Sequence, residues 1–337
     1  MENIAISVIV PVYGVEKFIE RCARSIFGQT MTDGVEFIFV NDCATDRSLE
    51  VLTAIIDEYP PLSSQIKIIN HLCNRGLAAA RKTGLEAARG EYILNLDSDD
   101  YFERDMLEVM YKAAKDTNAD VVVSDYFMTT KKGDHYQECP LYDTREAILR
   151  SIITPWRYGN KTIGPSVWNK LIRRNLYTDH SIIPIEGINY GEDFIISMQI
   201  LYYADVITKV DRAFVHYNKL NSDSYTQDKS ASNCRQRLKA TETVAGFLAR
   251  KGCVFDEEFD ERRFCEKMIA VTNCDSADLG EFLPMYPWLD YEKHKQLIAR
   301  HWRLPYKFAL QGDRTMFVFL RNLLLPIRRI YRFIYAR

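Results

Sequence analysis

Short apolar segments alternate with helical segments through the first 128 residues of this 337-residue chain. The apolar segments are rich in β-branched residues, which is typical of buried strands, and the segments between them carry apolar residues at helical spacing. Strands and helices that alternate in this way form right-handed crossovers between parallel strands. We therefore predict an α/β fold, with a mostly parallel twisted sheet flanked by helices on both faces. The predicted strands are 4–12, 35–40, 66–70, 92–96 and 120–125, and the predicted helices are 15–27, 48–59, 77–88 and 105–115.

Polar side chains gather where the predicted strands end. The carboxyl ends of parallel strands share one edge of the sheet, and open α/β sheets bind ligands at this edge. We therefore expect one shared ligand pocket there. The polar side chains at these strand ends are Tyr13, Asp42, Asn74, Arg75, Asp97 and Asp99.

The strand at 92–96 runs directly into three acids, Asp97, Asp99 and Asp100. In an extended chain, Asp97 and Asp99 point to the same side. Two carboxylates about 4 Å apart repel each other by roughly 4 kcal/mol at an effective dielectric constant near 20, and a cation removes this penalty. Mg²⁺ and Mn²⁺ suit such oxygen ligands. The alternative is a solvated acidic turn that caps the following helix, because Asp is a good N-cap.

Several other classes of protein are disfavoured by the sequence. A Gly-x-Gly-x-x-Gly motif and a Gly-x-x-x-x-Gly-Lys-Ser/Thr motif are both absent, which argues against a typical Rossmann cofactor site and a Walker-type NTPase. A net charge of −2 argues against a nucleic-acid partner. The eight cysteines include no Cys-x-x-Cys pair, no basic leader precedes the first strand, and no apolar run approaches the ~20 residues of a spanning helix. We expect a cytoplasmic protein with free thiols.

Five ordered motifs in the first 100 residues resemble those of family 2 glycosyltransferases, which have the GT-A fold and include many enzymes of bacterial surface-polysaccharide synthesis. The motifs begin with Val-Pro-Val-Tyr-Gly, Ser-Ile-Phe-Gly-Gln-Thr, Val-Asn-Asp-Cys-Ala-Thr-Asp, Asn-Arg-Gly-Leu-Ala-Ala-Ala-Arg and Gly-Glu-Tyr-Ile-Leu-Asn-Leu-Asp-Ser-Asp-Asp. The resemblance implies a nucleotide-sugar donor, here expected to be a UDP-sugar, a divalent Mn²⁺ or Mg²⁺ ion, and inversion at the anomeric carbon. The motifs occupy residues 10–22, 25–30, 40–48, 74–81 and 90–100.

The resemblance also implies roles for individual residues in binding the donor. Pro11, Val12 and Tyr13 would line the base, Asp42 would bond the base edge, and Arg75 would face the nucleotide. Asp97 would approach the ribose or the metal, and Asp99 would ligate the metal. As plain alternatives, Tyr13 is an ordinary loop aromatic and Asp42 a turn former. The sequence departs from the family at Gly14, which is usually Asn, and at 41–44, which is usually Asp-Asp-Gly-Ser.

A second acidic pair, Glu192 and Asp193, precedes an apolar helix predicted at 195–203. Displacement at a sugar carbon requires a carboxylate that takes the proton of the acceptor hydroxyl. The match to the family's Glu-Asp motif assigns this role to Asp193, with Glu192 in reserve. The alternative is an N-cap, since the helix dipole favours negative charge there. Nearby, Lys170 is either a phosphate contact or, by default, a solvated lysine, and His216 in the strand at 205–217 is more often structural than a ligand.

The chain is expected to divide into a donor domain at 1–128, an acceptor-side subdomain at 129–228 and a helical region at 229–337. Residues 314–337 contain six arginines and no acid, and Arg314, Arg321, Arg328 and Arg332 share one helical face. A basic amphipathic helix of this kind is typical of a membrane interface. The alternatives are packing on the second domain and a dimer contact.

Together, these features predict an inverting, metal-dependent glycosyltransferase that moves a sugar to a saccharide or lipid-linked saccharide in surface polysaccharide assembly, peripheral on the inner face of the plasma membrane if 314–337 binds it. A nucleotidyltransferase is the enzymatic alternative, but it would need a Gly-rich phosphate loop after the first strand. A non-catalytic, membrane-associated protein that binds sugar nucleotides is the other alternative.

Overall fold

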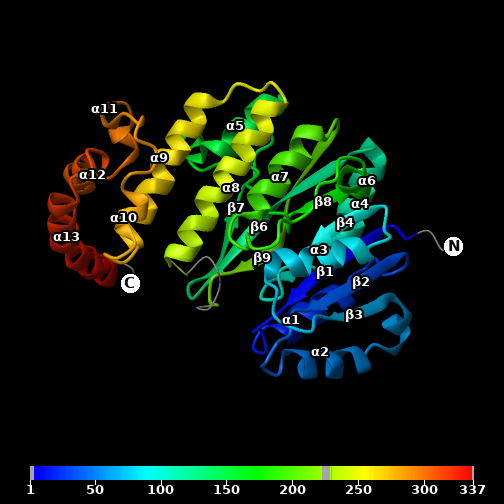
Figure 1. Ribbon diagram of the computed structural model, residues 1–337. Helices are drawn as coiled ribbons and strands as arrows, with labels where there is room; N and C mark the ends of the chain where they lie inside the picture. Colours follow the sequence, from blue (N-terminus) through cyan, green and yellow to red (C-terminus); the bar gives the residue numbers. More distant parts are fainter. Residues whose placement is uncertain (1–3, 222–227, 229, 336–337) are drawn as a thin grey trace. The chain divides into compact units, whose positions relative to one another are not determined.

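The computed structural model describes residues 4–221, 228 and 230–335, with the side chains of 325–335 left out. The chain forms two compact units, Met1–Ser224 and Tyr225–Arg337. Figure 1 shows the sheet and its helices in the first unit, and helices in the second. Within the described residues, no helix is both long enough and apolar enough to span a bilayer.

The first unit is built on one nine-stranded sheet with the order β3-β2-β1-β4-β8-β6-β9-β5, in which β7 pairs with β6 at the side. Strands β1 to β4 run parallel, as do β6 and β9, whereas β8 runs antiparallel to both of its neighbours. The strands are β1 Ile6–Val12, β2 Val35–Asn41, β3 Ile66–Asn70, β4 Tyr92–Asn95, β5 Tyr101–Phe102, β6 Val121–Thr130, β7 Gly133–Gln137, β8 Lys170–Arg173 and β9 Ile207–Asn218.

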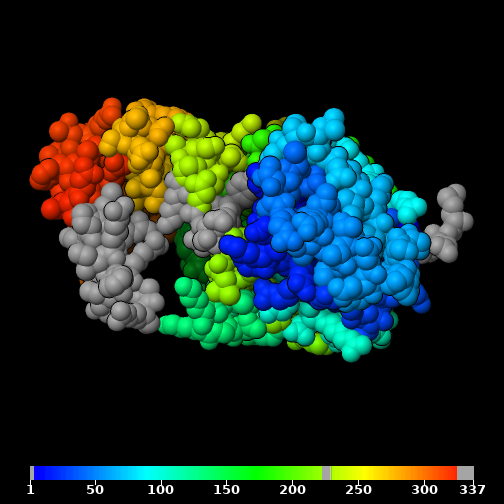
Figure 2. Space-filling view, turned by 90° about the horizontal axis from the view of Figure 1, so that it is seen from below, coloured from blue at the N-terminus to red at the C-terminus, as the bar shows by residue number. Residues whose placement is uncertain are grey.

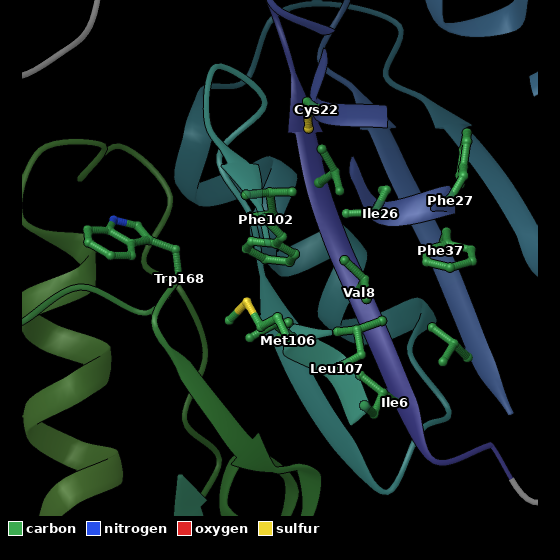
Figure 3. Close-up of a cluster of buried hydrophobic side chains, with 14 of the residues drawn as sticks. Ile6, Val8, Cys22, Ile26, Phe27, Phe37, Phe102, Met106, Leu107 and Trp168 are labelled. Carbon is green, nitrogen blue, oxygen red and sulfur yellow. The ribbon is translucent and has the colours of Figure 1, made fainter. Parts of the chain in front are cut away.

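Helices cover both faces of this sheet, and the alternation of side chains along β1 shows how. Ile6, Val8 and Val10 are fully buried on the face that also packs against α1, α2 and α4, and Figure 3 shows several of these side chains meeting in one layer. In Figure 2, the mid-blue residues of α2 lie on the near face of this unit. The helices of the unit are α1 Ile19–Phe27, α2 Ser48–Asp57, α3 Leu77–Ala87, α4 Met106–Thr117, α5 Arg145–Ile153, α6 Arg174–Asp179 and α7 Glu192–Tyr203.

The predicted α/β fold with a mostly parallel sheet and a helical C-terminal region is confirmed. Each strand and helix predicted within residues 1–128 is present, although α1 begins at Ile19 instead of residue 15 and β6 continues past residue 125. Strands β5, β7 and β8 were not predicted. The division at residues 128 and 129 stays a prediction, but β6 crosses this position and β8 pairs with β4, so both parts share one sheet.

The second unit is helical and has its own apolar core, which includes Phe264, Phe282 and Phe317. One arginine of the basic face predicted for the last helix, Arg321, is buried inside the second unit, whereas a membrane-facing helix would expose it. Arg321 is 4% exposed and donates to the backbone oxygens of Val271 and Cys274 at the end of α9. The helices are α8 Ala231–Arg250, α9 Asp256–Asn273, α10 Leu279–Phe282, α11 Tyr291–His294, α12 Arg303–Leu310 and α13 Arg314–Tyr335.

On its exposed side, the first half of α13 carries three apolar residues beside Arg314, Thr315 and Asn322. Met316, Phe319 and Leu323 recur at helical spacing, and Phe319 and Leu323 are 63% and 59% exposed. Arg314 donates to the backbone oxygen of Ser276. The side chains of Arg328 and Arg332, which the prediction placed on the same face, lie outside the described residues.

Helix α3 approaches the sheet closely because of Gly84. An added Cβ at Gly84 would lie 2.3 Å from Cγ2 of Ile9 in β1. Ala78, Ala79 and Ala80 are also fully buried in this helix. The small residues fix the depth at which α3 packs, and with it the position of every side chain that α3 presents.

We expect Gly84→Ala to destabilise the first unit by roughly 1–3 kcal/mol, because the overpacking exceeds the gain in helix propensity. Gly246→Ala in α8 is the matched control, since a Cβ there meets only the tip of Arg250 at 3.3 Å; we expect it to stabilise by about 0.5–1 kcal/mol. Hydrogen exchange at β1 and α8 amides reports each unit separately. If the two changes had equal effects on stability, this result would contradict the close approach of α3 to β1.

Candidate active site

The acids that follow β4 lie in a turn. The N–H of Asp100 donates to the backbone oxygen of Asp97 at 2.9 Å, which closes a turn over 97–100. The expectation that Asp97 and Asp99 lie in an extended segment was therefore wrong, because β4 ends at Asn95. The alternative of a solvated turn is also wrong for Asp100, which is fully buried.

The end of β9 holds this acidic turn in place. The backbone N–H of Asn218 donates to Oδ1 of Asp100 at 2.7 Å, and its side-chain amide donates to the backbone oxygen of Asp99 at 3.1 Å. The amide of Asn221 donates to Oδ2 of Asp99 at 2.8 Å. Segments more than 100 residues apart in the sequence thus fix the carboxylate positions.

Negative charge in the turn is only partly balanced. Burial, and then the neighbouring charge of Asp97, raise the pKa of Asp99 to about 6. Burial and the charges of Asp99 and Asp97 raise the pKa of Asp100 well above its usual range. Both shifts have the direction expected where carboxylates crowd together and lack a cation.

We tested whether this turn fits a divalent ion. Among the described residues, no group of three or more His, Cys, Asp or Glu side chains forms a complete metal site. Mg²⁺ is typically held by one or two carboxylates together with substrate phosphates, so a complete protein cage is not needed. Asp97 and Asp99 supply such a pair, and their mutual repulsion favours a cation, so the donor set fits.

Arg81, which was not predicted as a site residue, joins the two acidic motifs. Its Nη2 lies 2.5 Å from Oδ1 of Asp97, and its Nη1 contacts both Oε1 of Glu192 and Oδ1 of Asp193. The Arg81 side chain is 2% exposed. The structure therefore brings Asp97 and the Glu192–Asp193 pair, 95 and more residues apart in the sequence, around one guanidinium.

Glu192 and Asp193 are the first residues of α7, after Gly191 as the N-cap with φ of +104°. Neither acid is the N-cap residue, but both lie in the first turn, where the helix dipole favours negative charge. Burial raises the pKa of Asp193, whereas the Arg81 charge lowers it. Burial and the neighbouring Asp193 raise the pKa of Glu192 well above its usual range.

Lys170 is neither solvated nor free to meet a phosphate. Its ammonium group is fully buried and donates to the backbone oxygens of Ile163, Gly164 and Ser166 at 2.6–3.0 Å. Burial lowers its pKa to about 8. The hydroxyl of Ser197, one helical turn after Asp193, donates to the next carbonyl in the same loop, that of Pro165. Lys170 therefore shapes the loop beside α7.

The predicted donor residues differ in how accessible they are. Tyr13 is 50% exposed, whereas Pro11 and Val12 are buried. Arg75 is partly exposed and pairs with Glu186 at 2.9 Å. Their roles stay predictions.

Asp42 is buried, and both of its oxygens accept hydrogen bonds from the protein. Oδ1 accepts from the backbone N–H of Arg75 at 2.9 Å and lies 2.7 Å from Nδ1 of His71, and Oδ2 accepts from the N–H of Gly76 at 2.7 Å. Asp42 therefore ties the end of β2 to the loop that precedes α3. Its predicted contact with a base edge stays a prediction.

The two departures from the family pattern both include a residue with left-handed backbone. Gly14 has φ of +66° and Cys43 has φ of +60°. This left-handed region favours Gly and Asn, so it suits either residue at position 14. At Cys43 the chain adopts this backbone without a glycine, and Oδ1 of Asn41 accepts from the N–H of Ala44 at 2.9 Å.

His216 is enclosed in the first unit, in agreement with a structural role. Its ring stacks on Tyr101 with a centroid distance of 4.2 Å and on Phe127 at 4.7 Å. Its Nε2 lies 2.8 Å from Oε1 of Glu103 and its Nδ1 lies 3.1 Å from Oδ2 of Asp134.

Chemically, the site combines a carboxylate turn that fits a cation with a second carboxylate pair held next to it. Such a set can bind a phosphate-bearing ligand through a metal and accept a proton from a nucleophile nearby. Arg81 could have been suspected from the sequence, because it is the last residue of a family motif. It follows the uncharged residues Leu77 to Ala80 and precedes Lys82.

Comparisons with known proteins found relatives of this chain in sequence and in fold. EpsH of Bacillus subtilis strain 168, a protein named as a glycosyltransferase, is 34% identical over 259 residues, which is 74% of this chain and 70% of EpsH. Staphylococcus aureus TarS 1–349, solved in complex with UDP-GlcNAc, aligns with a TM-score of 0.63 at 19% identity over 94% of this chain and 90% of that chain. Pyrobaculum calidifontis mannosyltransferase PcManGT, solved with GDP-Man and Mn²⁺, aligns with a TM-score of 0.55 at 15% identity over 100% of this chain and 90% of that chain.

These structures share the fold, and the match to EpsH extends the likeness to sequence over most of both chains. The model of the family described as "Glycosyl transferase family 2" matches residues 7–180, which is more than half of the chain. The chain therefore belongs to glycosyl transferase family 2.

Proposed function

We propose that this protein is an inverting, metal-dependent glycosyltransferase that moves a sugar from a UDP-sugar to a saccharide or lipid-linked saccharide in cell-surface polysaccharide assembly. The observation that carries the proposal is the contact of Arg81 with both Asp97 and Asp193. This contact brings the predicted donor turn, which contains Asp97, and the predicted base, Asp193, to the two terminal nitrogens of one guanidinium. TarS with UDP-GlcNAc and PcManGT with GDP-Man and Mn²⁺ support the nucleotide-sugar and the metal by analogy of fold.

Asp193 acts as the general base in this proposal. Its carboxylate takes the proton of the acceptor hydroxyl, and the acceptor oxygen forms a bond to the anomeric carbon of the donor sugar. The bond from that carbon to the diphosphate oxygen breaks, and UDP leaves with the electron pair. A single displacement of this kind inverts the anomeric configuration. Glu192, buried beside Asp193, would be the reserve base.

Asp99 and Asp97 would hold the divalent ion. When bound, the ion supplies a positive charge that stabilises the diphosphate leaving group. Asn221 orients the Asp99 carboxylate for this task through its hydrogen bond. Asp97 would be shared between this ion and Arg81.

The nucleotide would lie at the ends of β1 and β2. Tyr13 is exposed there and can stack on a base, a contact worth roughly 1–3 kcal/mol in nucleic-acid systems. Pro11 and Val12 would contribute backbone surface. Asp42 would act mainly by fixing the loop that carries Arg75, in addition to its predicted contact with the base. Residues 1–128 would thus serve the donor and 129–228 the acceptor.

A test of this function starts with purified protein, Mn²⁺ and a panel of UDP-sugars, with UDP release by slow hydrolysis as the readout. We expect Asp193→Asn to keep its affinity for UDP and Mn²⁺ in calorimetry and to lose about 10²–10⁴-fold in turnover, because it lacks the base. Asp99→Ala should lose Mn²⁺-dependent UDP binding.

Asp57→Asn, at an exposed site on α2, is the control and should match wild type. UDP binding by wild type without UDP release from any UDP-sugar would favour the non-catalytic alternative, and release of pyrophosphate from a nucleoside triphosphate would favour the nucleotidyltransferase.

A stability measurement tests the charge balance at Asp99. Because its pKa rises from 3.8 to about 6 on folding, the folded state holds a proton that the unfolded state has lost between these pH values. Wild-type stability should therefore fall as pH rises from about 4 to 6. We expect Asp99→Asn to equal wild type below pH ~4 and to exceed it by up to about 3 kcal/mol above pH ~6, in urea unfolding of the first unit. A difference that is constant with pH would contradict this.

We also propose that α13 binds an anionic membrane surface at the inner leaflet. Its outward residues Met316, Phe319 and Leu323 are apolar, and the sequence from 314 to 337 has six arginines and no acid. Ile327, Ile330 and Ile334 continue the same spacing in the sequence. An anionic surface complements this charge, whereas a second copy would bring arginine-rich segments together.

We expect the double change Phe319→Ser and Leu323→Ser to weaken pelleting with phosphatidylglycerol vesicles by at least about 10-fold. Each apolar side chain contributes roughly 1.5–3 kcal/mol when it moves from water into the bilayer. Both residues are exposed, so the melting temperature should stay unchanged. Thr315→Ser is the control at another exposed position of α13. Pelleting that is equal for the variant and wild type would contradict the proposal, and self-association without vesicles would indicate a dimer contact instead.

A further inference from the structure

Arg81 is placed by the packing of α3. Gly84, three residues later, lets the helix lie against Ile9 of β1, and Ala78 to Ala80 are fully buried. The Arg81 side chain is therefore held under the carboxyl edge of the sheet with 2% of its surface exposed. The packing of α3 sets the position of its Cα, and burial restricts where its side chain can lie.

The partners of Arg81 distinguish it from two other buried or partly buried arginines, Arg173 and Arg321. Arg173 donates to the backbone oxygen of Ala119 as well as to acids, and Arg321 donates to backbone oxygens and a hydroxyl. The hydrogen bonds that Arg81 makes within the described residues go to carboxylates alone, and all three belong to the proposed site. Its Nε has no acceptor among the described residues.

The planar guanidinium fixes two directions at once. One terminal nitrogen contacts the pair at the start of α7, and the other contacts the turn after β4. The angle between these nitrogens is rigid, so the position of Asp193 is tied to that of Asp97. A lysine carries the same charge but only a single nitrogen on a flexible stem, and it cannot hold both groups in a fixed relation.

We propose that Arg81 is the positioning residue of the transfer reaction, which aims the Asp193 carboxylate at the anomeric carbon by anchoring it to the turn that holds the donor. This inference rests on the proposed function and names a residue that works through Asp193. The reaction is sensitive to such alignment, since a misplacement of about 1 Å can reduce turnover about 100-fold.

The test compares Arg81→Lys with wild type, with the UDP-sugar of the panel that wild type hydrolyses fastest and Mn²⁺. We expect kcat to fall about 100-fold and KM for the UDP-sugar to stay within about threefold, because donor binding does not need the alignment. Arg173→Lys is the matched control: it also removes a partly buried arginine that bridges two acids, Glu91 and Asp120, away from the site. We expect its kcat to remain within about threefold of wild type.

The double variant Arg81→Lys with Asp193→Asn separates positioning from general support of the fold. If Arg81 acts through Asp193, the double variant should turn over no more slowly than Asp193→Asn alone, since groups that act as a unit are non-additive. If Arg81→Lys does not fold, Arg81→Gln combined with Glu192→Gln removes one charge of each sign and should show the same loss of kcat with unchanged KM.

Two outcomes would overturn the inference alone: a kcat for Arg81→Lys within threefold of wild type, or losses that multiply in the double variant. A wild-type protein that binds UDP and Mn²⁺ but hydrolyses none of the UDP-sugars, with or without a saccharide acceptor, would overturn the proposed function, and this inference with it.

Discussion

One buried cation surrounded by acids is the interaction on which the site depends. Asp97, Glu192 and Asp193 meet at Arg81, so three acids share one positive charge. Removal of a partner from a buried ion pair typically costs about 3–5 kcal/mol, because a charge is left uncompensated. Because the three acids outnumber the one arginine, the first unit carries a surplus of negative charge at the place where a metal and a diphosphate would act. The fold must be stable enough to tolerate this surplus.

The rest of the first unit supports this arrangement from several sides. Helix α3 is pressed onto β1 at Gly84, β9 holds the acidic turn through Asn218, and Lys170 organises the loop beside α7. The contacts of Gly84 with Ile9 and of Asn218 with Asp100 are non-local in sequence, whereas Lys170 binds a loop four to seven residues away. The site is consequently a property of the complete sheet, and its acids are oriented by residues that have no part in the chemistry.

The sequence predicted the parallel half of the sheet well, because β-branched strands and helical spacing are local signals. Through the family motifs, it also singled out Asp97, Glu192 and Asp193, which the structure brings together around Arg81. It did not predict β8, whose antiparallel pairing with β4 spans about 80 residues, nor Arg81, because helical spacing does not reveal where a long side chain ends. Periodicity alone does not tell which face of α13 packs inward, and Arg321 proved to be buried.

The insertion of β8 between β4 and β6 has a consequence for how such proteins diversify. A recombination event near residue 128 would divide β6 and separate β4 from its neighbour, so a donor half from one relative could not simply be joined to an acceptor half from another. Exchange of sugar specificity within this architecture must instead proceed by substitution in loops or by transfer of the first unit as a whole.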